Sequence, residues 1–234
     1  PKEYVTDGEI KEILQEATGN VKARINLFDK LQELSTSLGN KVENKSHLNH
    51  LKDLIRRIDT KKIMDTVIEI SKNRPFSSGM LNGNTVTIGF DDKVGELDSI
   101  TKLSPFSDKS AAEIYAHELV HAAMRFALAN GNTLKIKSLI DQILRLQLAA
   151  KKVVTWEDFM PSTYDPNLKE VYEENAKQIY DYIFNNPDIK NLRGVHEFIA
   201  YGLTNENLMN KLKQHYVPSN INSEKESVLD KLIK

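Results

Sequence analysis

The chain has 234 residues, of which 40% are hydrophobic and 28% are charged, a composition typical of a globular protein with a sizeable core. Its 32 basic and 33 acidic residues leave a net charge of -1, so no charge imbalance favours nucleic acid or an anionic membrane as a partner. The chain contains no cysteine, which excludes disulfides, thiolate metal sites and cysteine nucleophiles and leaves His, Asp and Glu as the available metal ligands.

The first part of the chain is predicted to be helical. Apolar residues recur at spacings of three and four from residue 8 to residue 73, and Pro75 ends this pattern. No run of 18 or more apolar residues occurs, and the N-terminus lacks the features of a signal peptide, so we expect a soluble chain. The pattern predicts a helical N-terminal extension over residues 1–74.

A short β segment and then a long helix are predicted next. Residues 85–90 (TVTIGF) alternate as a half-buried strand does, with residues 80–81 as the expected hairpin partner. An Ala-rich, Gly-free run follows over residues 111–129, with Ser107-Asp108 as its expected N-cap. The sequence therefore predicts a small hairpin or sheet before a well-delimited helix.

The second half of the chain is again predicted to be helical. Helices are expected over residues 133–153, 167–185 and 188–215, with prolines at the joints between them. Residues 217–234 are weakly apolar and are expected to form a loop and a short C-terminal helix. The fold class that follows is α+β and predominantly helical.

The helix predicted over residues 111–129 carries the sequence HELVH at positions 117–121. His117 and His121 are four residues apart, so on a helix both rings lie on one face and can bind the same ion. Glu118 emerges about 100° further round the helix, where its carboxylate can activate a water molecule and carry a proton to a leaving amine. This spacing predicts a zinc-dependent hydrolase; the alternative is a structural histidine pair beside a solvated glutamate.

A catalytic zinc needs a third protein ligand, and residues 192–205 offer two candidates. His196 and Glu197 are adjacent in an apolar helix and about 100° apart, so the two cannot easily face the same ion. The residues leave three possibilities open: Glu197 is the ligand with His196 as an oxyanion donor, His196 is the ligand, or neither binds.

Other polar residues are expected to have simpler roles. Glu113 lies one turn before His117 and is expected to be an exposed helix carboxylate, with hydrogen bonding to a ligand ring as the alternative. The remaining histidines are expected to be exposed or capping residues and not ligands. They are His47, His50 and His215.

The order of these segments resembles the gluzincin-type metallopeptidases. A strand, an HExxH helix and a later helix with Glu-Phe-Ile-Ala before Leu-Thr-Asn are similar to the compact metallopeptidase-like domains of large phage and mobile-element polyproteins. The likeness covers roughly residues 80–212, and only the two motifs are distinctive. It implies His117 and His121 as zinc ligands, Glu118 as the general base and Glu197 as the third ligand.

Tyr201, one turn beyond Glu197, departs from this resemblance, because such domains often carry an acidic residue there that orients a ligand. The Tyr201 hydroxyl can instead donate to a tetrahedral oxyanion, so the expected catalytic residues are Glu118, Tyr201 and His196. The resemblance also suggests that the strand at residues 85–90 is an edge strand that pairs with extended substrate; a simple core hairpin is the alternative.

The resemblance implies a zincin-like metallopeptidase domain over residues 75–216. We expect one Zn²⁺ per chain and hydrolysis of peptide bonds by a zinc-activated water, with a polypeptide substrate and no nucleic acid or membrane partner. The phage likeness implies a place in a virion or in the cytoplasm of an infected bacterium. The alternative is a catalytically inactive zincin-like structural or interaction domain, for example a virion or polyprotein component.

Overall fold

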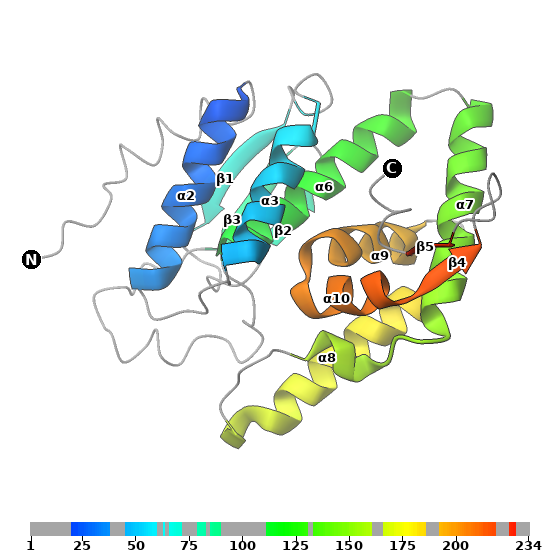
Figure 1. Ribbon diagram of the computed structural model, residues 1–234. Coiled ribbons are helices and arrows are strands. Elements are labelled where there is room, and N and C mark those ends of the chain that lie inside the picture. Colours follow the sequence, from blue (N-terminus) through cyan, green and yellow to red (C-terminus); the bar gives the residue numbers. More distant parts are fainter. Residues whose placement is uncertain are drawn as a thin grey trace, which may run out of the picture. The chain divides into compact units, whose positions relative to one another are not determined.

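The computed structural model of the chain describes residues 20–37, 45–59, 63, 66–71, 79–82, 85–89, 111–130, 133–160, 166–185, 192–218 and 225–227. Its helices are α2 (Val21–Ser37), α3 (Lys45–Arg57), α6 (Ala111–Asn130), α7 (Thr133–Lys151), α8 (Lys169–Phe184), α9 (Arg193–Thr204) and α10 (Glu206–Gln214), with 3-10 turns η2 (Trp156–Phe159) and η3 (Pro166–Leu168) (Figure 1). Its strands are β1 (Val67–Ser71), β2 (Gly79–Asn82), β3 (Thr85–Gly89), β4 (Tyr216–Pro218) and β5 (Lys225–Ser227).

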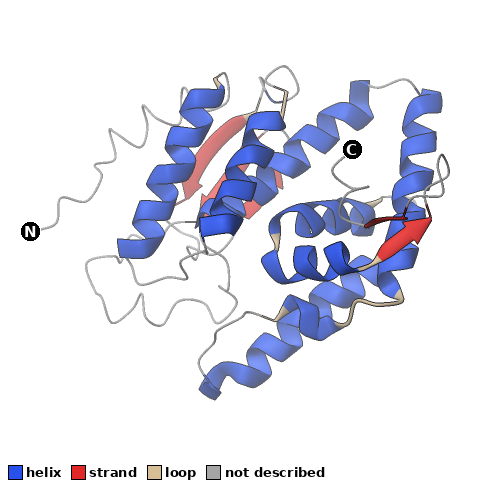
Figure 2. Cartoon of the chain, viewed as in Figure 1, coloured by secondary structure: helices blue, strands red, loops and turns tan. Residues whose placement is uncertain are grey.

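Helices make up most of the described chain (Figure 2), which confirms the prediction of a predominantly helical protein. Within the described residues, none of these helices has the length and apolar character needed to cross a membrane. The chain divides into two compact units, residues 1–127 and 128–234.

The first unit has one apolar cluster to which α2, α3, β3 and α6 all contribute. Leu51 and Ile55 of α3 are fully buried in it together with Val86 of β3 and Leu119 of α6. Helices α2 and α3, predicted as an extension, therefore belong to the same core as the helix that carries HELVH.

The sheet of the first unit has the strand order β1-β3-β2. Strand β2 pairs with β3 in antiparallel order, with Met80 opposite Thr87, and β1 pairs with β3 in parallel, with Val67 opposite Thr85. Because β3 is the central strand, both of its edges are occupied, and the suggestion that residues 85–90 form a substrate-pairing edge strand is wrong. The fully buried Val86 accords with a strand that builds the core instead.

Strand β1 corrects the prediction of an all-helical segment over residues 1–74. Residues 67–71 read VIEIS, and their β-branched side chains favour a pleated strand over a helix once a partner strand is available. That partner, β3, follows later in the chain, so periodicity within the segment did not reveal the strand. The helix expected around residue 10 lies outside the described residues.

Helix α6 begins and ends within a residue of its predicted bounds. Every residue from 112 to 122 is buried, as expected for a helix whose apolar residues are not confined to one face. The predicted N-cap, Ser107-Asp108, lies outside the described residues. The HELVH sequence is thus in the most enclosed part of the helix.

In the second unit, α9 packs against α8 and α7 at close range. Gln147 of α7 donates to the carbonyl of Ile183, and Lys151 donates to the carbonyl of Phe184 at 3.0 Å, so α7 satisfies the last carbonyls of α8. Aromatic rings of this unit pack edge to face around the ring of Phe159. The centroids of the Phe159 and Tyr201 rings lie 5.8 Å apart. These contacts hold α9, the helix that carries Glu197.

The single helix predicted over residues 188–215 is wrong, since the described part of this segment forms α9 and α10. Asn205 separates them in an extended conformation (φ -84°, ψ 120°), and its side chain accepts a hydrogen bond from the Leu208 amide at 3.0 Å. An asparagine in this position caps the next helix and competes with continuation of the previous one.

The predicted C-terminal loop contains two short strands. Residues 216–218 and 225–227 pair as the antiparallel strands β4 and β5, with Tyr216 opposite Ser227. Such a short ladder depends on pairing between separate segments, which neither segment's own apolar pattern reveals. The end of the chain, where the helix was expected, lies outside the described residues.

Replacing Gly194 by alanine should destabilise the second unit. A Cβ at this position would lie 3.0 Å from the backbone oxygens of both Ile183 and Tyr182, so α8 and α9 would have to separate. Such overpacking costs about 1–3 kcal/mol, and the middle of this range outweighs by about 1 kcal/mol the gain of about 1 kcal/mol from replacing a helical glycine. We expect the melting temperature to fall by about 2–4 °C. Asn210→Ala, at an exposed position of α10, is the control and should leave it nearly unchanged.

Candidate metal centre

Two histidine rings project from consecutive turns of α6. His117 is 5% exposed and His121 is 9% exposed, so both imidazoles are largely removed from water. Their rings meet edge to face, and their Nε2 atoms lie 3.1 Å apart. The two histidines therefore aim the same ring nitrogen at one small region, as the four-residue spacing predicts.

This separation fits a shared metal ion. Two nitrogens bound to one tetrahedral zinc at about 2.0–2.1 Å would be about 3.3 Å apart. The observed 3.1 Å needs only a small ring movement to reach that value. Nε2 coordination would leave Nδ1 of each ring to carry the proton.

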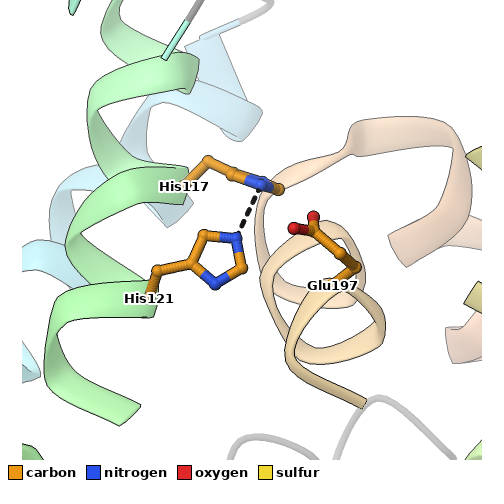
Figure 3. A group of neighbouring side chains, drawn as sticks. All are labelled: His117, His121 and Glu197. Atoms are coloured by element: carbon orange, nitrogen blue, oxygen red, sulfur yellow. Dashed lines mark hydrogen bonds between the residues drawn. The ribbon is translucent and has the colours of Figure 1, made fainter. Parts of the chain in front are cut away.

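Glu197 of α9 completes a group of three potential ligands. One ring nitrogen from each histidine and one carboxylate oxygen of Glu197 all lie within 4.8 Å of one another (Figure 3). Two imidazoles and a carboxylate can hold a metal ion, and this nitrogen and oxygen set is one that divalent zinc accepts. Among the described residues, the potential metal-binding group contains Glu197 and not the neighbouring His196.

Glu118 directly follows His117 in the sequence of α6. It is only 7% exposed, although a glutamate in a helix is ordinarily solvated. The alternative of a solvated glutamate is therefore wrong for this residue. Its burial beside His117 is the arrangement expected of a carboxylate that exchanges protons within a site.

His196 and Tyr201, the other two predicted catalytic residues, are both half-buried on α9. The Tyr201 ring lies against Phe159 in the aromatic cluster of the second unit, so packing holds at least the body of this side chain. Donation from either side chain to a reacting oxygen stays a prediction.

Two residues expected to be exposed are buried. Glu113 is 1% exposed and His47 is 4% exposed, and the His47 Nε2 and Glu113 Oε2 atoms lie 4.0 Å apart. A signal for His47 was present in the sequence, because it precedes the buried Leu51 and Ile55 by four and eight residues on one stripe of α3. Glu113 similarly shares its face of α6 with His117.

A further buried polar pair supports the first unit at a different place. Arg24 of α2 is fully buried and donates to the carbonyl of Ile58 at 3.0 Å. Burial disfavours the charged form of each side chain, so it lowers the pKa of Arg24 and raises the pKa of Tyr115. The charges of Tyr115 and Asp59 oppose the effect on Arg24. Sequence analysis singled out neither residue, and the Arg24 hydrogen bond ties α2 to the residue that follows α3.

Comparisons with protein-family models, with curated proteins and with solved structures found no match to this chain.

Proposed function

We propose that the chain is a zinc-dependent metallopeptidase of the gluzincin type, with His117, His121 and Glu197 as the ligands of one zinc ion. The observation that carries the proposal is the 3.1 Å approach of the His117 and His121 Nε2 atoms on α6, with the buried Glu118 between them in sequence. A histidine pair with only a packing role would not need its neighbouring carboxylate to be enclosed as well.

A zinc ion at this position would polarise the scissile carbonyl and lower the pKa of a water molecule toward neutrality. Glu118 is the general base: its carboxylate takes a proton from the attacking water and later delivers that proton to the departing amine nitrogen. Its enclosure favours this shuttle, because proton transfer needs a carboxylate that bulk water does not fully solvate.

Glu197 is the third ligand in this proposal, and His196 is left available as a hydrogen-bond donor to the developing oxyanion. Tyr201 is the second candidate for that role. A carboxylate at the third position also balances the charge of a dication better than a third imidazole would. The substrate is a polypeptide, and by the likeness to phage domains the setting is a virion or an infected bacterium.

Metal removal tests the proposal directly. The purified protein should contain one zinc per chain by elemental analysis and should cleave an unfolded protein or a fluorogenic peptide library. Treatment with 1,10-phenanthroline should remove the zinc and abolish cleavage, and stoichiometric Zn²⁺, but not Mg²⁺, should restore it.

A wild-type protein that binds no zinc from a metal-buffered solution would overturn the proposal. Bound zinc without cleavage of any peptide in a broad library would instead favour the inactive zincin-like structural domain. These two outcomes are separated by measuring metal content and cleavage on the same preparation.

A further inference from the structure

The first unit contains a second pair of buried polar side chains close to the HELVH sequence that the proposed function does not use. Glu113 lies in the first turn of α6, and His47 lies in the first turn of α3. Both side chains are 2% exposed, and 4.0 Å separates the His47 Nε2 atom from the Glu113 Oε2 atom. That distance is longer than a hydrogen bond and within reach of an ion pair.

Burial of these two polar side chains costs solvation free energy. A carboxylate enclosed in protein loses several kcal/mol of solvation, on the order of what one compensating charge can return. Two apolar residues of similar volume would fill the same space between α3 and α6 at no such cost. The retention of a glutamate and a histidine here calls for a role beyond packing.

The position of Glu113 relative to His117 indicates that role. The two residues are four apart on α6, so they lie on the same face in successive turns. Helical side chains lean toward the N-terminus, which places the His117 ring over the turn that carries Glu113. Because His117 directs Nε2 toward His121, its Nδ1 atom is the ring nitrogen left for interactions with the protein.

We propose that Glu113 and His47 form a positioning pair that orients the His117 imidazole for metal binding. Glu113 favours the tautomer with the proton on Nδ1, because a nearby carboxylate stabilises a ring N-H that faces it. His47 holds the Glu113 carboxylate in place from the neighbouring helix. The inference rests on the metal-binding part of the proposed function and is independent of the reaction that follows.

The positioning pair gives α3 a role at the metal centre. If His47 sets the orientation of Glu113, the helix at residues 45–57 is part of the support of the metal centre. Helices α2 and α3 are then needed for metal affinity as well as for the apolar cluster they share with α6. The full chain is accordingly the form of the protein to test.

The test measures the zinc affinity of the 234-residue chain by competition with a chromogenic chelator. Glu113→Gln and His47→Leu should each weaken zinc binding by about 10- to 100-fold, the range typical of residues that orient a metal ligand. His47→Gln keeps a donor near the position of Nε2 and should recover most of the affinity. The double variant Glu113→Gln/His47→Leu should be no weaker than Glu113→Gln alone, because the two residues act through one contact.

Asn49→Leu is the control, since it introduces the same apolar residue at an exposed position of α3 and should change the affinity less than about 3-fold. Thermal unfolding of the metal-free variants identifies effects on the fold alone. Variants that melt lower but bind zinc as tightly as wild type would overturn the positioning role, as would an equal loss in Asn49→Leu. If His47→Leu does not fold, His47→Gln and Glu113→Gln decide the matter.

These outcomes separate the inference from the proposed function. A wild-type protein that binds zinc and cleaves peptides while the variants keep full affinity overturns only the positioning pair. Variants that lose affinity in a protein without peptidase activity leave the positioning pair standing and overturn the peptidase. A wild-type protein with no zinc affinity overturns both.

Discussion

Replacing Glu118 by glutamine is expected to lower the rate of peptide hydrolysis by about 10²- to 10⁴-fold while the protein keeps its zinc. Glutamine has the shape of glutamate but cannot accept the proton of the attacking water or return it to the leaving amine. The Glu118 side chain is buried, and an amide of the same shape should fit the same space with little effect on folding. The loss should therefore appear in kcat and not in metal content.

The measurement is single-turnover or steady-state cleavage of a fluorogenic peptide, with zinc determined on the same sample. Glu33→Gln provides the control, because it makes the same change on the exposed surface of α2, where Glu33 pairs with Lys30. That control should retain wild-type activity. Full activity in Glu118→Gln would show that Glu118 is not the general base. A loss of zinc together with activity would show that Glu118 is needed for zinc binding.

Glu197→Ala is expected to weaken zinc binding on the order of 1000-fold. This loss exceeds the roughly 10- to 100-fold loss typical of residues that orient a metal ligand without binding the ion. It removes the only carboxylate in the group formed with His117 and His121 among the described residues. His196→Ala, which truncates the adjacent residue of the same helix, should change the affinity by less than about 3-fold if His196 is no ligand.

Competition with a chromogenic chelator measures both affinities under identical conditions, and circular dichroism confirms that α9 remains folded. The reverse order, with His196→Ala the weaker binder, would assign the third ligand to His196. Equal and small effects in both variants would mean that α9 supplies no ligand and that the histidine pair binds metal with another partner.

The central part of the site was predictable because its geometry is local. Four-residue spacing in one helix places His117 and His121 on one face whatever the rest of the chain does, and the position of Glu118 follows from the same helix. Composition alone excluded thiolate ligands. The bounds of α6 were also predictable, since a long Ala-rich run between polar residues forms a helix in almost any context.

Features that depend on partners distant in sequence were predicted poorly. Strand β1 forms against β3, and β4 forms against β5, although the segments themselves have little periodic pattern. The expected edge strand proved central because β1 occupies its second edge. Asn205 divides two helices that apolar spacing alone joins into one, since a side-chain cap changes the backbone without changing the pattern.

By itself, the sequence determined the histidine pair of the candidate site, the face of α6 that carries it and the mainly helical character of the chain, because spacing and composition act over a few residues. Only the tertiary structure decided that the potential metal-binding group contains Glu197 and not His196, and that Glu113 and His47 are buried as a pair. Burial and the choice between adjacent residues depend on which helices pack together, and packing is a property of the whole folded chain.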